Sequence, residues 1–172
     1  MDSLKHDAAD QPAVRCAIVT VSDTRTEATD GSGAIIRKLL SQSGHRVCGY
    51  EILPDEPDRV RDAVTRLCHR PDCQAVLVNG GTGIAPRDST VDALSTVFEK
   101  RLDGFGELFR MLSFEQIGPT AMLSRATAGV VAETIVFVMP GSPPAVQLAM
   151  DKLIVPCLAH MAGLLRHGER RE

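Results

Sequence analysis

The stretch Ala75–Gly83 reads AVLVNGGTG and joins a continuous apolar run to a loop that contains three glycines. Four apolar residues, two of them β-branched, are typical of a strand that is buried on both faces of a sheet. After the loop, apolar side chains recur between Val91 and Phe98 with the spacing of an amphipathic helix. The segment therefore predicts a strand, a glycine-rich loop and a helix, in that order.

The same order recurs at two earlier places in the chain. Arg15–Val21 is a β-branched apolar run before a polar loop, and Ile35–Leu40 then carries a helical pattern that Gly44 ends. Val47–Leu53 is a weaker strand, and the helical pattern of Val60–Cys68 follows it. Parallel strands need crossover connections of this kind, so the repeated order predicts a mainly parallel sheet with helices on both faces.

A fourth unit completes the α/β pattern. The strand Thr134–Met139 leads through the turn Pro140–Pro144 into a long helical tract, which Pro156 is expected to kink or divide. Ala126–Val131 also reads as extended, and Ala132–Glu133 would turn it back along the last strand to give an antiparallel edge. The predicted fold class is therefore α/β, a three-layer α/β/α arrangement with a mainly parallel sheet.

The chain has 172 residues, which suits one domain with one well-buried core. We expect a disordered N-terminal tail at 1–13, a single domain at 14–166 and a charged C-terminal tail at 167–172. The net charge of -3 and the absence of Trp give no basic or stacking surface for nucleic acid. No apolar run reaches the roughly 18 to 20 residues of a membrane span, so we expect a cytoplasmic protein.

Cysteines and histidines do not indicate chemistry of their own. The five cysteines form no CxxC pair and suggest reduced thiols rather than disulfides. Cys68, His69 and Cys73 could be imagined as a zinc site, but a fourth ligand at usable spacing is missing. The histidines avoid the glycine-rich loops, which disfavours nucleophilic hydrolysis.

The loops after the four strands are the expected binding region, because ligands of open α/β sheets bind beyond the carboxyl ends of the strands. Glycines at Gly80, Gly81 and Gly83 allow positive φ and close backbone approach, so the loop can cradle an anion, although a tight turn would explain them too. Neither a P-loop nor a dinucleotide fingerprint is present. A bound triphosphate would therefore need Arg87, loop amides or a divalent metal to neutralise its charge.

Carboxylates are frequent in these loops and would suit magnesium. Asp30, Asp58 and Asp92 are also explained as helix caps or turn residues. Asp55 and Asp88 are the better candidates for chemistry, although Asp88 could instead cap the helix that begins near Ser89.

Two further segments are weaker candidates. Pro140–Ser142 places a turn before a helix and is a second candidate for binding an anion. Gly104–Glu107, together with Arg110, could form a lid or a pocket wall, although a loop followed by an ordinary helix start explains these residues equally well.

Taken together, these motifs resemble the MoaB/Mog family of molybdenum cofactor biosynthesis proteins. The resemblance covers about Arg15 to Leu165, and Phe109–Gly118 is more similar to the MoaB branch. The motifs that carry it are Thr20–Arg25 (TVSDTR), Asp30–Gly33 (DGSG), Leu53–Glu56 (LPDE), Gly80–Gly83 (GGTG) with Arg87 and Asp88, Gly104–Glu107 (GFGE), Ser124–Arg125 (SR) and Pro140–Ser142 (PGS).

The resemblance implies a molybdopterin-binding domain that, in active members, transfers AMP from ATP to molybdopterin with magnesium and releases pyrophosphate. It implies that Asp55 and Asp88 are the catalytic, metal-binding carboxylates. It also implies trimers, or trimers paired into hexamers. The substrate-binding residues that it suggests are Ser22, Asp23, Asp30, Gly80, Gly81, Thr82, Gly83, Arg87, Glu107, Ser124, Pro140, Gly141 and Ser142.

Two alternatives remain open at this point. The same fold and loops would also suit a non-catalytic molybdopterin-binding or carrier protein. Related domains of larger proteins are a second alternative, which we expect to be excluded by the short chain.

Overall fold

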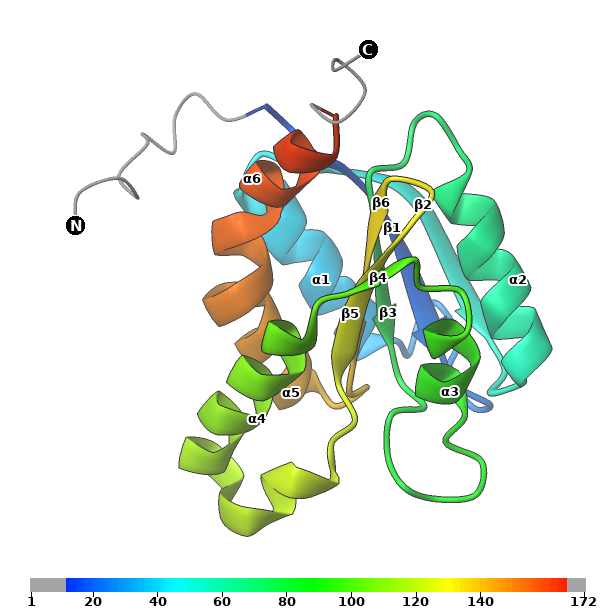
Figure 1. Cartoon of the computed structure of the whole chain (residues 1–172). Coiled ribbons are helices and arrows are strands. Elements are labelled where there is room, and N and C mark those ends of the chain that lie inside the picture. Colours follow the sequence, from blue (N-terminus) through cyan, green and yellow to red (C-terminus); the bar gives the residue numbers. More distant parts are fainter. Residues whose placement is uncertain (1–11, 167–172) are drawn as a thin grey trace.

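A computed structural model describes residues 12–166 and shows one six-stranded sheet in the order β2-β1-β3-β6-β5-β4 (Figure 1). Apart from Pro12 and Ala13, the two predicted tails lie outside the described residues. The strands are β1 (Arg15–Val21), β2 (Arg46–Leu53), β3 (Ala75–Asn79), β4 (Lys100–Arg101), β5 (Thr127–Val131) and β6 (Thr134–Met139). The helices are α1 (Gly31–Gln42), α2 (Pro57–Cys68), α3 (Thr90–Ser95), α4 (Asp103–Ile117), α5 (Pro143–Ala149) and α6 (Val155–Arg166), with a 3₁₀ helix η1 (Gly118–Leu123) and a π-helical turn η2 (Met150–Ile154).

The strand directions confirm the predicted mixed sheet. Strands β2, β1, β3 and β6 are parallel, whereas β5 pairs antiparallel with β6 and β4 pairs antiparallel with β5. The turn between β5 and β6 places Ala132 and Glu133 in the left-handed region, with φ of 47° and 65°. The sequence reading missed β4, because its two residues, Lys100 and Arg101, are charged and exposed and carry no apolar pattern.

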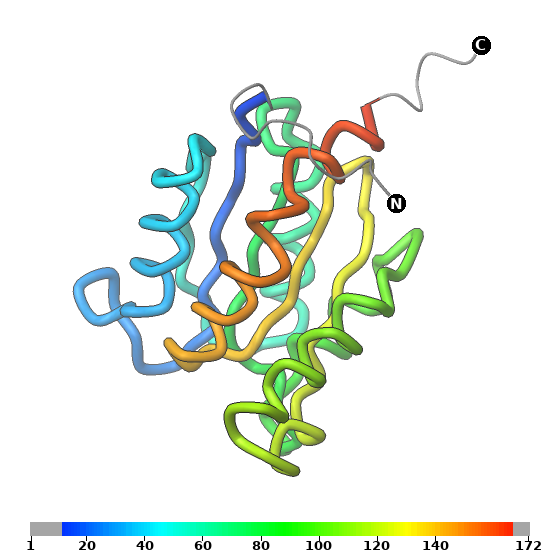
Figure 2. Tube along the Cα trace, turned by 90° about the vertical axis from the view of Figure 1, so that its left-hand side faces the viewer, coloured from blue at the N-terminus to red at the C-terminus, as the bar shows by residue number. Residues whose placement is uncertain are grey.

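Helices cover both faces of the sheet, so the predicted three layers are confirmed. Helices α1, α4, α5 and α6 lie on one face, which Figure 2 views, and α2 and α3 lie on the other. Successive residues of β1 enter opposite cores: Cys16 and Ile18 pack toward the first group of helices, and Ala17 and Val19 toward the second. Both sets are fully buried, which explains why the strand is apolar without alternation.

The last helical tract is divided just before Pro156 by the π-helical turn η2, and the chain stays helical on both sides. The π-helical turn η2 ends at Ile154, one residue before Val155–Pro156, so the irregular backbone accommodates the proline that cannot donate a hydrogen bond. The whole tract Pro143–Arg166 passes, by length and composition, as a helix that could cross a membrane, with a mean hydropathy of 1.5 over 18 residues. This membrane-compatible composition was not predicted, because Asp151 and Lys152 interrupt the apolar residues of the tract. In this fold the tract packs on the sheet through Val146, Met150, Ile154 and Leu158, among others.

Asp30 joins three elements at the carboxyl edge of the sheet. Its carboxylate caps α1 by accepting from the Gly33 backbone N–H at 2.9 Å, and it also accepts from the hydroxyls of Thr20 (2.6 Å) and Tyr50 (2.7 Å). Burial by itself raises the pKa of Asp30, but the three hydrogen bonds outweigh it and hold the pKa below its ordinary value. The ionised form therefore stabilises the contact between β1, β2 and α1.

We expect Asp30→Asn to lower the free energy of unfolding by about 1–3 kcal/mol near neutral pH, because an amide replaces a charged acceptor of three hydrogen bonds. Because the folded pKa is lowered, the contribution of Asp30 is fully present above about pH 4 and is lost as the pH falls through the folded value. Denaturant unfolding of both proteins at several pH values checks this, with exposed Asp103→Asn as the control. A difference that widens in acid would contradict it.

Candidate functional site

The loops that follow the four parallel strands meet at one edge of the sheet, the lower edge in Figure 1. The Gly80 N–H donates to the carbonyl oxygen of Met139 at 3.0 Å, and the Ser22 N–H donates to that of Leu53 at 2.8 Å. The Ser32 hydroxyl at the start of α1 donates to the Gly141 carbonyl at 2.8 Å. The predicted binding region is therefore one continuous surface, built from residues that are far apart in sequence.

Two glycines of the loop after β3 have left-handed backbones, with φ of 106° at Gly80 and 63° at Gly81. A Cβ at Gly80 would collide with the carbonyl oxygen of Val21, so the tight-turn explanation holds at this position. A Cβ at Gly81 would instead collide with the hydroxyl of Thr90 and crowd the carboxylate of Asp55. Gly81 thus leaves open the space between two polar side chains, which a turn alone does not require.

The two predicted catalytic carboxylates lie against this loop. Asp55 accepts from the hydroxyl of Ser89 at 2.9 Å and approaches Gly81, and the Asp88 carboxylate lies beside Gly83. Asp88 accepts from the Ala85 N–H at 2.9 Å and so closes the loop before α3. It does not cap α3, whose N-cap is Ser89, so the helix-cap explanation of Asp88 is wrong.

Asp23 connects the loop after β1 to Asp55 and to Arg87, the neighbour of Asp88 in the sequence. It forms an ion pair with Arg87 at 2.8 Å and accepts from the backbone N–H of Asp55 at 3.2 Å. The Arg87 side chain is 70% exposed, so the ion pair contributes little to stability, about 1 kcal/mol at most. Arg87 can therefore exchange Asp23 for an anionic ligand without a large loss.

Arg125 anchors the glycine-rich loop, and the sequence reading assigned it no role of its own. Its guanidinium donates to the carbonyl oxygens of Gly83 (2.9 Å) and Asp88 (2.6 Å) and forms a two-point ion pair with Asp92. Its backbone N–H donates to the Thr82 carbonyl at 3.1 Å. The motif Ser124–Arg125 carried the only sequence signal, because Arg125 lies more than 30 residues from the loop that it holds.

Five of the remaining predicted residues line one or the other of two further cavities. Ser22, Asp30 and Gly141 line a cavity of about 270 Å³ at the ends of β1 and β3. Glu107 and Ser124 line a wider one of about 480 Å³ between α4 and β5. Pro140 and Ser142 lie beside the first cavity as partly exposed and exposed residues, and Thr82 is buried. Ligand contact by each of these residues stays a prediction.

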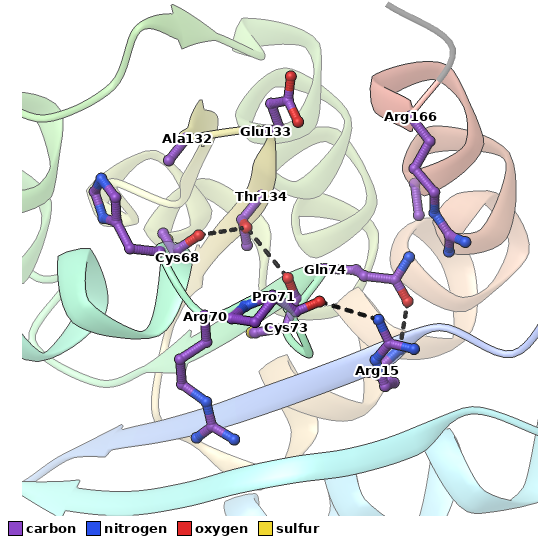
Figure 3. A pocket seen from close by; sticks show the side chains of 12 residues that line it. Arg15, Cys68, Arg70, Pro71, Cys73, Gln74, Ala132, Glu133, Thr134 and Arg166 are labelled. Atoms are coloured by element: carbon purple, nitrogen blue, oxygen red, sulfur yellow. Dashed lines mark hydrogen bonds between the residues drawn. The ribbon is translucent and has the colours of Figure 1, made fainter. Parts of the chain in front are cut away.

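A third cavity, of about 340 Å³, lies at the opposite edge of the sheet, near the turn at Ala132–Glu133 (Figure 3). Two of the arginines that line it hold the loop before β3. Arg15 donates to the carbonyl oxygens of Pro71 and Asp72, and Arg70 forms an ion pair with the Asp72 carboxylate. None of the predicted site residues lines this cavity.

Arg125→Ala should loosen the loop without unfolding the sheet. We expect faster hydrogen exchange of the amides between Thr82 and Ser89 and a loss of about 1–2 kcal/mol in unfolding free energy, because two hydrogen bonds to loop carbonyls and an ion pair with Asp92 disappear from a partly exposed side chain. Hydrogen exchange read by mass spectrometry checks this. Arg61→Ala, which removes an exposed arginine with two carboxylate partners on α2, is the control and should leave the loop unchanged. Equal exchange in both variants would contradict the role of Arg125.

Comparison with known proteins agrees with this geometry. A family model described as "Probable molybdopterin binding domain" matches residues 17–160. The "Molybdenum cofactor biosynthesis protein B" of Bacillus subtilis is 53% identical over 154 residues, which are 89% of this chain and 91% of that protein.

Solved structures match over nearly the whole described fold. A "Crystal structure of Molybdenum cofactor biosynthesis protein B" superposes with a TM-score of 0.89 at 51% identity and covers 91% of this chain and 98% of that one. The "Molybdopterin biosynthesis enzyme MoaB" of Thermus thermophilus has a TM-score of 0.79 at 33% identity, covering 90% and 97%. The resemblance inferred from the motifs is confirmed: the chain belongs to the MoaB/Mog family of molybdenum cofactor biosynthesis proteins.

Proposed function

We propose that this protein transfers AMP from ATP to molybdopterin, giving adenylyl-molybdopterin and pyrophosphate. The observation that carries the proposal is that Asp55, from the loop after β2, lies beside Gly81, and Asp88, from the glycine-rich loop itself, lies beside Gly83. Two acidic side chains separated by 33 positions in the sequence thus border one anion-binding segment. Two carboxylates repel the phosphate of molybdopterin unless a cation accompanies it, so their position favours a site that also takes Mg²⁺.

The carboxylates beside the loop fit a Mg²⁺ ion that binds together with the substrate better than one that the protein holds by itself. Among residues 12–166, no group of three or more His, Cys, Asp and Glu side chains could hold a metal. Mg²⁺ is commonly bound through one or two carboxylates plus substrate phosphates and water, which Asp55 and Asp88 can provide with ATP. Bound there, it would neutralise phosphate charge during the transfer.

The loop amides have distinct roles in this proposal. The Gly80 N–H already donates to the Met139 carbonyl, so it is not among the amides that can bind an anion. Within the described part of the chain, the N–H groups of Gly81, Thr82 and Gly83 donate to no protein acceptor. These three amides and Arg87 are therefore the groups that we expect to bind phosphate oxygens.

The reaction needs positioning more than proton transfer. The terminal phosphate of molybdopterin is a monoester that is already ionised near neutral pH, so it can attack the α-phosphorus of ATP without a general base. The Pα–O bond to the β-phosphate breaks, and pyrophosphate leaves with that electron pair. The loop amides and Arg87 would hold the two anions in line, and Asp55 and Asp88 would hold the Mg²⁺ that accompanies them; this orientation supplies most of the rate enhancement.

Asp55→Asn and Asp88→Asn should each lower AMP transfer by about 100-fold or more, because the amide keeps the shape of the carboxylate but removes its charge. Asn at position 88 can still accept from the Ala85 N–H, so the loop stays closed. Pyrophosphate release from ATP, Mg²⁺ and molybdopterin measures the effect. Asp62→Asn on the exposed face of α2 is the matched control and should retain full activity.

The carrier alternative makes the opposite prediction for the same mixture. A wild-type protein that binds molybdopterin tightly, releases no pyrophosphate and is insensitive to both substitutions would be a binding protein, and the transferase proposal would be wrong.

We also propose that the protein forms homo-oligomers, as the family resemblance implies. An exposed apolar surface on α4 and η1 supports this, because large apolar patches on folded chains commonly mark interfaces. Its members are Leu108, Met111, Phe114, Ile117, Met122 and Leu123, each at least 46% exposed.

Phe114→Glu should dissociate the assembly, because a charge would have to be buried at the centre of this surface. Light scattering after gel filtration should then report the mass of one 18.5 kDa chain, whereas the wild type should give a multiple of it. Leu164→Glu, at an equally exposed leucine on α6, should leave the mass unchanged. A wild type that already runs as a single chain would contradict the proposal.

A further inference from the structure

The hydroxyl of Thr90, the first residue of α3, has no hydrogen-bond partner although it is buried. Thr90 is 0% exposed, and its Oγ1 is the one buried side-chain oxygen or nitrogen in the described chain that lacks a partner. The backbone N–H of the same residue donates to the Gly81 carbonyl at 3.2 Å, so the main chain is satisfied. A buried hydroxyl without a partner disfavours folding, whereas an apolar side chain of the same shape would not.

The surroundings of this hydroxyl point toward the candidate catalytic site. A Cβ on Gly81 would meet Thr90 Oγ1 first and would lie 2.7 Å from Oδ2 of Asp55. The hydroxyl and this carboxylate oxygen therefore both border the space that the missing side chain of Gly81 leaves open. Any other residue at position 81 would crowd both of them.

The other oxygen of Asp55 is already held from the same place in the chain. Ser89, directly before Thr90, donates its hydroxyl to Oδ1 of Asp55 at 2.9 Å. Two consecutive hydroxyl residues thus stand beside the two oxygens of one carboxylate, and only the first of them is bonded. A small movement of Asp55 toward Gly81 would satisfy the second.

We propose that Thr90 is a positioning residue, whose hydroxyl donates to Oδ2 of Asp55 when nucleotide and metal bind and so fixes the carboxylate between Ser89 and Thr90. This inference rests on the proposed function. The unpaired hydroxyl lowers the stability of the free protein. Its hydrogen bond to Asp55 forms only in the complex, so the free energy of that bond helps to orient Asp55 there. The remaining lone pairs of the carboxylate then face the ligand.

Thr90→Val is the direct test, because valine keeps the shape of threonine and removes only the hydroxyl. We expect a melting temperature equal to or above that of the wild type and, at the same time, a fall in kcat of about 10-fold or more with little change in the KM for molybdopterin. Thr90→Ser, which keeps the hydroxyl, should retain most of the activity. A role in packing alone would lower the melting temperature of Thr90→Val and would not be rescued by serine.

Thr134→Val is the matched control at the opposite edge of the sheet. Thr134 is also buried, but its hydroxyl donates to the carbonyl oxygens of Cys68 (3.0 Å) and Cys73 (3.4 Å). Removing it leaves those acceptors without this donor, so Thr134→Val should melt at a lower temperature and keep the kcat of the wild type. Thr90→Val should therefore lower turnover without lowering stability, and Thr134→Val should lower stability without lowering turnover.

A binding measurement separates this inference from the proposed reaction. The affinity for Mn²⁺ with ATP, read from the electron paramagnetic resonance of bound Mn²⁺, should fall several-fold in Thr90→Val and stay unchanged in Thr134→Val. A Thr90→Val protein with wild-type affinity and kcat would overturn the role of Thr90. A wild type that binds Mn²⁺ with ATP but releases no pyrophosphate would overturn the proposed reaction alone, and the affinities would still decide on Thr90. A wild type that binds neither Mn²⁺ nor ATP would overturn both the proposed reaction and the role of Thr90.

Discussion

The position of Gly80 depends on a backbone contact that no side chain would permit. Its α-carbon lies against the carbonyl oxygen of Val21 at the end of β1, and its N–H binds the carbonyl of Met139 at the end of β6. The ends of three parallel strands are therefore joined through one residue with a φ of 106°. Gly81, the next residue, is placed by this contact between Asp55 and Thr90.

The site combines stabilising and destabilising contacts, as functional sites often do. Asp30 joins β1, β2 and α1 through three hydrogen bonds on one side, and Arg125 holds the loop on the other. Between them lie two left-handed glycines, an exposed ion pair of Arg87 and a buried hydroxyl without a partner. Because Asp30 and Arg125 fix the elements around it, the loop can retain polar groups that have no hydrogen-bond partner.

The family places this chain in molybdenum cofactor biosynthesis, whereas the chemistry depends on particular side chains. A glycine-rich loop with free amides would bind an anionic pterin in a carrier as well as in an enzyme. Asp55 and Asp88 repel such a ligand unless a cation accompanies it, and ATP provides the phosphates that would bring one. The two carboxylates therefore favour transfer over carriage, and their charge is the property that the experiments must vary.

Much of the fold could be predicted from periodicity, because β1, β3 and β6 each contain a continuous apolar run of four or five residues and their helices carry amphipathic patterns. The short strand β4 could not, since its pairing with β5 is a tertiary feature. A division of the last helical tract near Pro156 was predicted, but the π-helical turn that makes it was not. Asp55 and Asp88 were candidates from residue type and motif alone.

Local sequence determined the strands, the loops, the carboxylates and the glycines, since each depends on neighbouring residues and on backbone freedom. Only the tertiary structure decided that Asp88 closes its own loop, that Arg125 holds that loop from the distant segment before β5, and that Thr90 is left unpaired beside Asp55. These facts depend on contacts between residues far apart along the chain, and the satisfaction of a hydrogen bond is visible only when both partners have been placed.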